Sequence, residues 1–226
     1  PLTGLANRRL FTDIAERALD RAASQQGRLA LIYLDLDRFK NVNDTLGHES
    51  GDQLLSVVAQ RIRGCVRADD CVARLGGDEF AILLDNLPSV SVVSGVAQNI
   101  ARTLSAAIDV AGQEIVATAS IGISVYPDDG RDVGTLLRHA DTAMYRAKQG
   151  GLGLAFYEAA MEAAVADRLR LENALRRGLE RDEITAFYQP VITSGGVPTG
   201  FEALVRWRHP ERGIVAPAEF IALAEE

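Results

Sequence analysis

The sequence predicts an α+β fold in which helices flank a mainly antiparallel sheet. Residues 29–34 are a continuous apolar run of strand length, which is typical of a central strand buried on both faces. Two further apolar runs, residues 72–75 and 81–84, flank a two-glycine turn, which is typical of a β-hairpin. Because helices and strands then mix without a strict βαβ alternation, we expect the α+β class.

Periodicity and turn residues predict the other elements of the first two thirds of the chain. Asn7 can cap a helix, and Gly150 with Gly151 can stop one. Helical spacing of apolar residues distinguishes the helices from the strands. The sequence predicts, in order, a helix over residues 7–27, the strand 29–34, a loop over 41–51, a helix over 52–63, the hairpin 72–84, a helix over 91–108, a strand over 115–126, a helix over 132–149 and a short edge strand over 154–157.

A change in composition at Glu158 predicts a domain boundary. From there to about Arg181 the chain is rich in Ala, Glu, Leu and Arg, which is typical of one long helix. We therefore expect two domains, residues 1–158 and residues 159–226. Beyond the long helix the sequence predicts a hairpin and a final helix: strands over 184–191 and 200–207, a turn at 194–196 and a helix from 218.

Composition excludes some classes of function. The chain has 226 residues, a net charge of −7 and a pI near 5.1. An acidic surface argues against nucleic acid or an anionic membrane as partner. No apolar stretch reaches the ~20 residues of a membrane span, and the first residues have no signal-peptide character. Cys65 and Cys71 lie in no metal-ligand spacing, so we interpret them as reduced structural residues of a cytoplasmic protein.

Four acidic residues are candidates for metal binding. Asp35 and Asp37 follow the buried strand, and Asp78 and Glu79 lie at the tip of the hairpin. Adjacent strands in one sheet would bring the two pairs together. With a strand-end carbonyl such as that of Leu36, they would offer oxygen ligands to Mg²⁺ or Mn²⁺. The alternative is that these acids only solvate turns.

The surrounding motifs, over residues 1–158, resemble those of GGDEF-domain diguanylate cyclases. This resemblance implies an α+β domain similar to the nucleotidyl cyclase and polymerase palm folds. The matching motifs occur in the family's order: Leu2 to Leu5 with Asn7-Arg8, Asp35 to Asp44, Gly47-His48, Gly51-Asp52, Arg74 to Phe80, Ser120 to Ser124, and Ala140 to Tyr145 with Ala147-Lys148.

The resemblance implies that two GTP molecules, one on each of two facing domains of a homodimer, are joined into cyclic di-GMP. Each 3′-hydroxyl would attack the α-phosphate of the other GTP, in metal-assisted phosphoryl transfer. By the same resemblance, Asp35, the Leu36 carbonyl and Asp78 hold Mg²⁺ or Mn²⁺. Asp78 also assists deprotonation of the hydroxyl, and Glu79 binds the second metal or orients the other ligands.

The resemblance also implies a substrate pocket. Asn43 and Asp52 match a pair that reads guanine, although Asn43 could instead form an Asx-turn and Asp52 could cap a helix. His48 lies beside this pair in the expected pocket, where we favour a structural role over metal ligation. Lys40, which we place among the catalytic residues, and Lys148 match lysines that contact the triphosphate. Each could also be an ordinary exposed lysine.

Three further residues concern activity and its regulation. Leu152 stands where the family usually has a phosphate-binding arginine, and loss of a charge-assisted contact can cost ~1.5–3 kcal/mol. This departure favours an alternative function, a weak or inactive module that binds GTP or cyclic di-GMP and regulates an attached phosphodiesterase. Arg67 and Asp70 match the family's RxxD inhibitory product site, with a local turn salt bridge as the alternative.

Residues 165–226 resemble the start of EAL-domain phosphodiesterases, which hydrolyse cyclic di-GMP. The matching segments are Leu169 to Glu172, Tyr188 to Val191 and Glu202 to Trp207. By this resemblance Glu202 would be a metal ligand and Arg206 a phosphate contact. A (β/α)₈ barrel needs ~250 residues, so we expect the helix and hairpin present here to be an incomplete domain without activity of its own.

Overall fold

The computed structural model describes residues 2–193, 195 and 198–224, and the chain forms two compact units, residues 1–162 and 163–226. Within the described residues, none of the helices combines the length and the apolar character that a membrane crossing requires.

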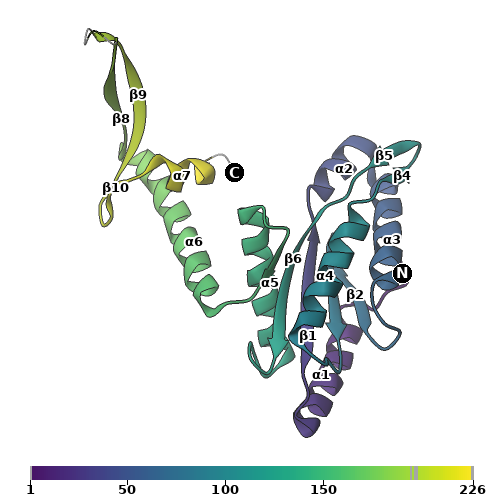
Figure 1. Ribbon diagram of the computed structural model, residues 1–226. Helices are drawn as coiled ribbons and strands as arrows, with labels where there is room; N and C mark the ends of the chain where they lie inside the picture. Colours follow the sequence, from purple (N-terminus) through teal and green to yellow (C-terminus); the bar gives the residue numbers. More distant parts are fainter. Residues whose placement is uncertain (1, 194, 196–197, 225–226) are drawn as a thin grey trace. The chain divides into compact units, whose positions relative to one another are not determined.

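The first unit is an α+β domain built on a five-stranded sheet of order β2-β3-β1-β6-β7 (Figure 1). The central strand β1 pairs antiparallel with β3 and β6, and only the edge strand β7 runs parallel to its neighbour. The predicted fold class and the predicted central strand are therefore confirmed. The strands are β1 (Leu29–Leu36), β2 (Cys71–Gly76), β3 (Glu79–Leu84), β6 (Ala119–Tyr126) and β7 (Leu154–Phe156).

Helices cover both faces of this sheet because alternate residues of β1 point in opposite directions. Ala30, Ile32 and Leu34 pack in a core with α3 and α4, whereas Leu29 and Leu31 pack in a second core with α1 and α5. The bounds of the helices are α1 (Arg8–Gln25), α2 (Phe39–Leu46), α3 (His48–Gly64), α4 (Val90–Leu104) and α5 (Val133–Gly150).

Helix α5 approaches β6 so closely that one position between them must be glycine. A Cβ atom on Gly122 would lie 2.0 Å from the carbonyl oxygen of Ala140 and 2.1 Å from the amide nitrogen of Met144. Both are backbone atoms, so no rotamer change could relieve the clash. The contact fixes α5 on the sheet, together with the functional side chains that α5 carries.

The structure corrects the expected loop over residues 41–51. This stretch belongs to α2 and α3, which meet at Gly47, whose φ of 85° suits glycine. The Asn- and Asp-rich sequence is typical of a loop, but Phe39 is buried and Val42 packs on the core, so tertiary contacts stabilise α2. Asn43 and Asp52 lie inside helices, so the Asx-turn and N-cap alternatives were wrong.

A short hairpin between α4 and β6 was not predicted. It consists of β4 (Ile108–Val110) and β5 (Gln113–Ile115), joined through Ala111 and Gly112. Both connecting residues have positive φ, at 53° and 81°. Helix α4 accordingly ends at Leu104, before the predicted end at residue 108.

The last residues of the first unit are held by α5. The ring of His139 stacks on that of Tyr157, with 3.9 Å between centroids and 3° between planes. The guanidinium of Arg138 pairs with the Glu162 carboxylate, and His139 Nε2 lies 3.3 Å from the same carboxylate. Glu162 lies in α6 (Ala159–Glu180), the predicted long helix, so the start of α6 is attached to α5.

The second unit contains a three-stranded antiparallel sheet of order β10-β9-β8. A small core surrounds Trp207, which is fully buried and donates its indole N–H to Glu183 Oε2 over 3.1 Å. Positions 194 and 196 of the predicted turn lie outside the described residues. The elements are β8 (Ile184–Ile192), β9 (Pro198–His209), β10 (Gly213–Val215) and α7 (Pro217–Ala224).

Candidate active site

The sheet brings the predicted acidic residues together at one end of β1. Asp35 lies opposite Glu79 in the pairing of β1 with β3. The Leu36 N–H donates to the carbonyl oxygen of Asp78 over 3.3 Å, which joins the hairpin turn to the end of β1. Gly77 holds this turn with a φ of 50°, a conformation that suits glycine. The hairpin therefore presents two carboxylates beside a third on the central strand.

Lys148 reaches this cluster from the last turn of α5. Its Nζ donates to Asp35 Oδ1 over 2.5 Å. Burial opposes the charged form, but the bond to Asp35 and the charges of Asp37 and Asp78 together raise the pKa of Lys148. Burial, followed by the neighbouring charges of Asp35 and Glu79, raises the pKa of Asp78, while Lys148 acts to lower it. The lysine thus balances part of the charge of the cluster.

Glu79 has neighbours to which the sequence analysis assigned no role. Arg8 Nη2 lies 3.8 Å from Glu79 Oε2, and the Tyr33 hydroxyl is hydrogen-bonded to Glu79. Burial, and then the charge of Glu79, raises the pKa of Tyr33 to about 12. Burial, with the charges of Glu79 and Asp35, also raises the pKa of Asp141. Arg8 and Asp141 lie in matched motifs, which was the only signal for them in the sequence.

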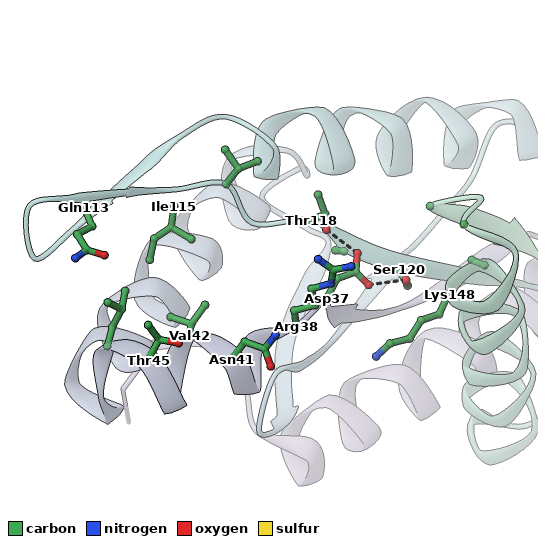
Figure 2. A pocket seen from close by; sticks show the side chains of 16 residues that line it. Asp37, Arg38, Asn41, Val42, Thr45, Gln113, Ile115, Thr118, Ser120 and Lys148 are labelled. Atoms are coloured by element: carbon green, nitrogen blue, oxygen red, sulfur yellow. Dashed lines mark hydrogen bonds between the residues drawn. The ribbon is translucent and has the colours of Figure 1, made fainter. Parts of the chain in front are cut away.

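Asp37 does not share the environment of Asp35. Its two carboxylate oxygens accept hydrogen bonds from the Thr118 and Ser120 hydroxyls, over 2.7 and 2.8 Å (Figure 2). Its N–H donates to the Thr118 carbonyl oxygen over 2.9 Å. Asp37 therefore fixes the connection between β1 and α2 to the start of β6, and this structural role explains why an acid stands here.

A cavity of about 890 Å³ extends from Asp37 and Lys148 toward α2 and the β4–β5 hairpin (Figure 2). Lys148 projects into it from one side, and Asn41 and Thr45 of α2 line the other. There is consequently space beside the acidic cluster for an elongated anionic group.

The two residues of the predicted guanine pair lie on α2 and α3, which pack on each other. The Asn43 side chain lies against Gly51, where an added Cβ would be only 1.9 Å from Asn43 Oδ1. Asp52 is the next residue and is exposed, as is His48 at the start of α3. Glycine at position 51 thus leaves room for the Asn43 side chain against α3, one residue before Asp52.

Two other positions of the predicted substrate pocket are exposed. Lys40 lies in the first turn of α2. Leu152 follows the end of α5, with 69% of its surface exposed. The leucine side chain has no hydrogen-bond donor to offer a phosphate. Position 152 therefore lacks the donor that the family's usual arginine would provide.

The predicted inhibitory pair lies elsewhere on the first unit. Asp70 is buried, and its Oδ2 accepts from the Arg67 N–H over 2.8 Å while its Oδ1 accepts from the Asp85 N–H over 3.3 Å. Within this turn, Asp70 therefore contacts the backbone of Arg67, whereas the salt-bridge alternative would use the Arg67 side chain. Arg67 and Asp70 line a hollow of about 340 Å³ whose other charged residues are Arg21, Arg28, Asp69 and Asp85. Arg21 is paired with Asp85 over 2.6 Å, and Arg28 with Asp128 over 2.6 Å.

The donor set of the acidic cluster fits a hard divalent cation. Among the described residues, no three His, Cys, Asp or Glu side chains converge as a preformed metal site. Mg²⁺ is usually held by one or two carboxylates with substrate phosphates and water rather than by a cage of protein ligands. Asp35 and Asp78, with a nearby backbone carbonyl, match that pattern.

In the second unit, Glu202 and Arg206 lie on β9. Glu202 is exposed and pairs with Gln189 in the sheet register. Arg206 is half-buried and donates to the Val205 carbonyl oxygen over 2.8 Å. Within the described residues, Glu202 belongs to no group of three or more His, Cys, Asp or Glu side chains that could hold a metal ion.

Comparison with known proteins yields matches to both units. Residues 1–153 match the family described as diguanylate cyclase, GGDEF domain, and residues 172–226 match the EAL domain. The chain is 43% identical over its whole length to the bifunctional diguanylate cyclase/cyclic di-GMP phosphodiesterase MucR of Pseudomonas aeruginosa. It is 42% identical over its whole length to the cyclic di-GMP phosphodiesterase PdeR of Escherichia coli. It spans only 33% and 34% of these proteins.

Solved structures match the first unit. The GGDEF domain of TpbB (YfiN) from P. aeruginosa has a TM-score of 0.68 and 42% identity, covering 69% of this chain and 98% of that domain. The GGDEF domain of DgcB from Caulobacter crescentus, solved in complex with c-di-GMP, has a TM-score of 0.65 and 32% identity, covering 70% of this chain and 92% of that one.

Proposed function

Because this chain belongs to the GGDEF-domain diguanylate cyclase family and continues into part of an EAL domain, we propose that residues 1–158 condense two GTP molecules into cyclic di-GMP. The reaction uses Mg²⁺ or Mn²⁺ and needs a homodimer, since each domain holds one GTP. The observation that carries this proposal is the convergence of Asp35, Asp78 and Glu79 with Lys148 at the end of β1.

The chain's own residues bind and orient the substrate. Asn43 and Asp52 recognise the guanine edge through an amide and a carboxylate. Lys40 and Lys148 hold the triphosphate beside the end of β1. A bound divalent ion supplies positive charge to the phosphates and favours ionisation of the attacking hydroxyl.

Asp78 accepts the proton of the 3′-hydroxyl in the proposed reaction. The 3′-oxygen then forms a bond to the α-phosphorus of the facing GTP, and the bond from that phosphorus to the bridging oxygen breaks, releasing pyrophosphate. Two such steps close the ring.

Incubating the purified protein with GTP and Mg²⁺ and separating the products by chromatography tests this proposal. We expect cyclic di-GMP from the wild type and a loss of about 10²-fold or more in Asp78→Ala. Asp182→Asn, at an exposed position of the second unit, controls for a change of surface charge. Tight GTP binding with no product would contradict the cyclase proposal.

A second candidate function has its own support. Leu152 occupies the usual arginine position and is exposed, and one relative is named only as a phosphodiesterase. In this alternative, the first unit binds GTP or cyclic di-GMP with little turnover and regulates an attached EAL domain. Leu152→Arg would restore a charge-assisted contact and lower the KM for GTP about tenfold or more. An unchanged KM would show that this position does not limit GTP binding.

Two finer roles complete the proposal. Arg67 and Asp70 bind cyclic di-GMP and inhibit the cyclase. The position of Arg67 at the edge of the hollow that it lines with Asp70 supports the role, because arginine pairs with phosphate and stacks on guanine. The EAL part, including Glu202 and Arg206, has no hydrolytic activity in this chain. Measurable hydrolysis of cyclic di-GMP by the purified protein would contradict the second statement.

A further inference from the structure

We propose that Lys148 is a built-in counter-ion of the metal site, bonded to Asp35 while no divalent ion is present and transferred to the triphosphate when the metal and GTP bind. This inference rests on the proposed function, which assigns Asp35 to the metal and Lys148 to the phosphates. In addition, Lys148 has two positions: it is bonded to Asp35 in one state and to the triphosphate in the other.

The ammonium group of Lys148 contacts the acidic cluster directly. Lys148 Nζ lies 2.5 Å from Asp35 Oδ1, so the ammonium group is bonded to the carboxylate that the proposed function assigns to the metal. A divalent cation at Asp35 and an ammonium group in hydrogen-bond contact with the same carboxylate would repel each other. This repulsion opposes metal binding while Lys148 stays on Asp35, so binding of the metal favours movement of Lys148 away from the carboxylate.

The Lys148 side chain has room to move from Asp35 into the neighbouring cavity. Its side chain is 47% exposed, whereas that of Asp35 is 15% exposed, so the lysine is the partner that is free to move. Lys148 also lines the 890 Å³ cavity, together with Gly151 and Gly153, which have no side chains to obstruct it (Figure 2). A triphosphate there offers the ammonium a new anionic partner.

The positive charge of Lys148 reduces repulsion within the acidic cluster. Asp35, Asp78 and Glu79 lie side by side, and without Lys148 their mutual repulsion would be larger in the metal-free protein. Removing the lysine should therefore favour metal binding and, at the same time, weaken triphosphate binding. A residue with a merely structural role would weaken both.

The test measures Mn²⁺ binding to the full chain without nucleotide, from the loss of the free Mn²⁺ signal in electron paramagnetic resonance. We expect Lys148→Met to bind Mn²⁺ about three- to fivefold more tightly than the wild type, the range of a partly exposed ion pair. In calorimetry with Mg²⁺ and the α,β-methylene analogue of GTP, the same variant should bind about tenfold more weakly. Lys148→Arg, which keeps the charge, should bind Mn²⁺ like the wild type.

Arg146→Met controls for loss of one positive charge at an exposed position of the same helix and should leave Mn²⁺ affinity unchanged. Wild-type Mn²⁺ affinity in Lys148→Met, or an equal gain in Arg146→Met, would overturn the inference and leave the proposed function intact. If neither the wild type nor Lys148→Met bound Mn²⁺, the metal site of the proposed function would fail, and the inference with it.

Discussion

The two units differ in how they cover their sheets. In the first, helices bury apolar residues against both faces of β1 and its neighbours. In the second, Tyr188, Ile192 and Phe201 of the hairpin are 69%, 60% and 71% exposed, and the core around Trp207 is small. A strand with exposed aromatic residues is typical of a sheet that lacks its covering layer. The first unit therefore carries its predicted site residues on a closed core, and the second carries Glu202 and Arg206 on an open sheet.

This difference predicts that the first unit resists unfolding better than the second and that each unfolds by itself. Trp207 is the single tryptophan of the sequence, so its fluorescence reports the second unit alone. Far-UV circular dichroism reports both. We expect the fluorescence transition at a lower denaturant concentration than the main dichroism transition, and coincident transitions would contradict independent unfolding.

Gly122→Ala should destabilise the first unit by about 3 kcal/mol, because the new methyl group meets the backbone of α5. The dichroism transition should move and the Trp207 fluorescence transition should not. Gly95→Ala is the matched control, since an added Cβ in α4 meets open space and should stabilise by about 0.5–1 kcal/mol. A shift of the fluorescence transition in Gly122→Ala would mean that the two units unfold together.

Leu175→Ala is the converse change in the second unit. Leu175 is 5% exposed in the small core, and its truncation should cost about 2–3 kcal/mol. The fluorescence transition should move to lower denaturant while GTP conversion by the first unit stays unchanged. Leu179→Ala, at an exposed position of the same helix, is the control and should leave the transition in place. Loss of GTP conversion in Leu175→Ala would show that the first unit depends on the second.

Gly51→Ala tests whether Asn43 of the first unit contacts guanine. The added Cβ meets the Asn43 side chain first and also comes within 3.2 Å of the Phe39 ring. Both neighbours are side chains rather than backbone, so the protein should still fold. We expect the KM for GTP to rise about tenfold, with smaller discrimination against ATP, because the amide no longer lies beside Asp52. Gly64→Ala, at an open position of the same helix, should change neither. An unchanged KM in Gly51→Ala would argue against Asn43 as a guanine contact.

A smaller effect is expected at Asp132, which caps α5. Hydrogen bonds from the Thr135 N–H and hydroxyl lower the pKa of this carboxyl. A folded-state pKa below the unfolded one contributes stability above the unfolded value of about 3.9, which is lost as the pH falls through the folded value. Asp132→Ala should thus lower the Tm at pH 7, with a difference that narrows below about pH 4. Asp132→Asn, which can still cap, should retain most of the wild-type Tm at pH 7.

Much of the fold could be predicted from the sequence because the informative patterns were local. The apolar run of β1, the two-glycine turn and the cap at Asn7 each predict their element without knowledge of the rest. Helix α2 could not be predicted in this way, because its residues favour a loop. The helix is stabilised by the burial of Phe39, which depends on tertiary contacts that the local sequence does not indicate. The β4–β5 hairpin has three-residue strands, too short to leave a pattern.

The site was predicted as a set of residue types rather than as a geometry. Register explains why Asp35 meets Glu79, and neighbouring strands could be expected from the hairpin. The contact between Asp35 and Lys148 joins residues 113 positions apart, and no local pattern indicates it. Asp35 and Asp37 look equivalent in the sequence, but only the fold supplies Asp37 with two hydroxyl donors. The roles of these residues in binding and catalysis stay predictions.

The attachment of Glu162 to α5 has a consequence for protein engineering. Arg138, His139 and the stacked ring of Tyr157 hold the chain where it leaves the first unit. A fluorescent reporter joined directly after Glu162 would therefore begin from a fixed anchor rather than from a loose tether. Replacing Glu162 by alanine before making the same fusion would release that anchor, which gives a matched pair of rigid and mobile fusions.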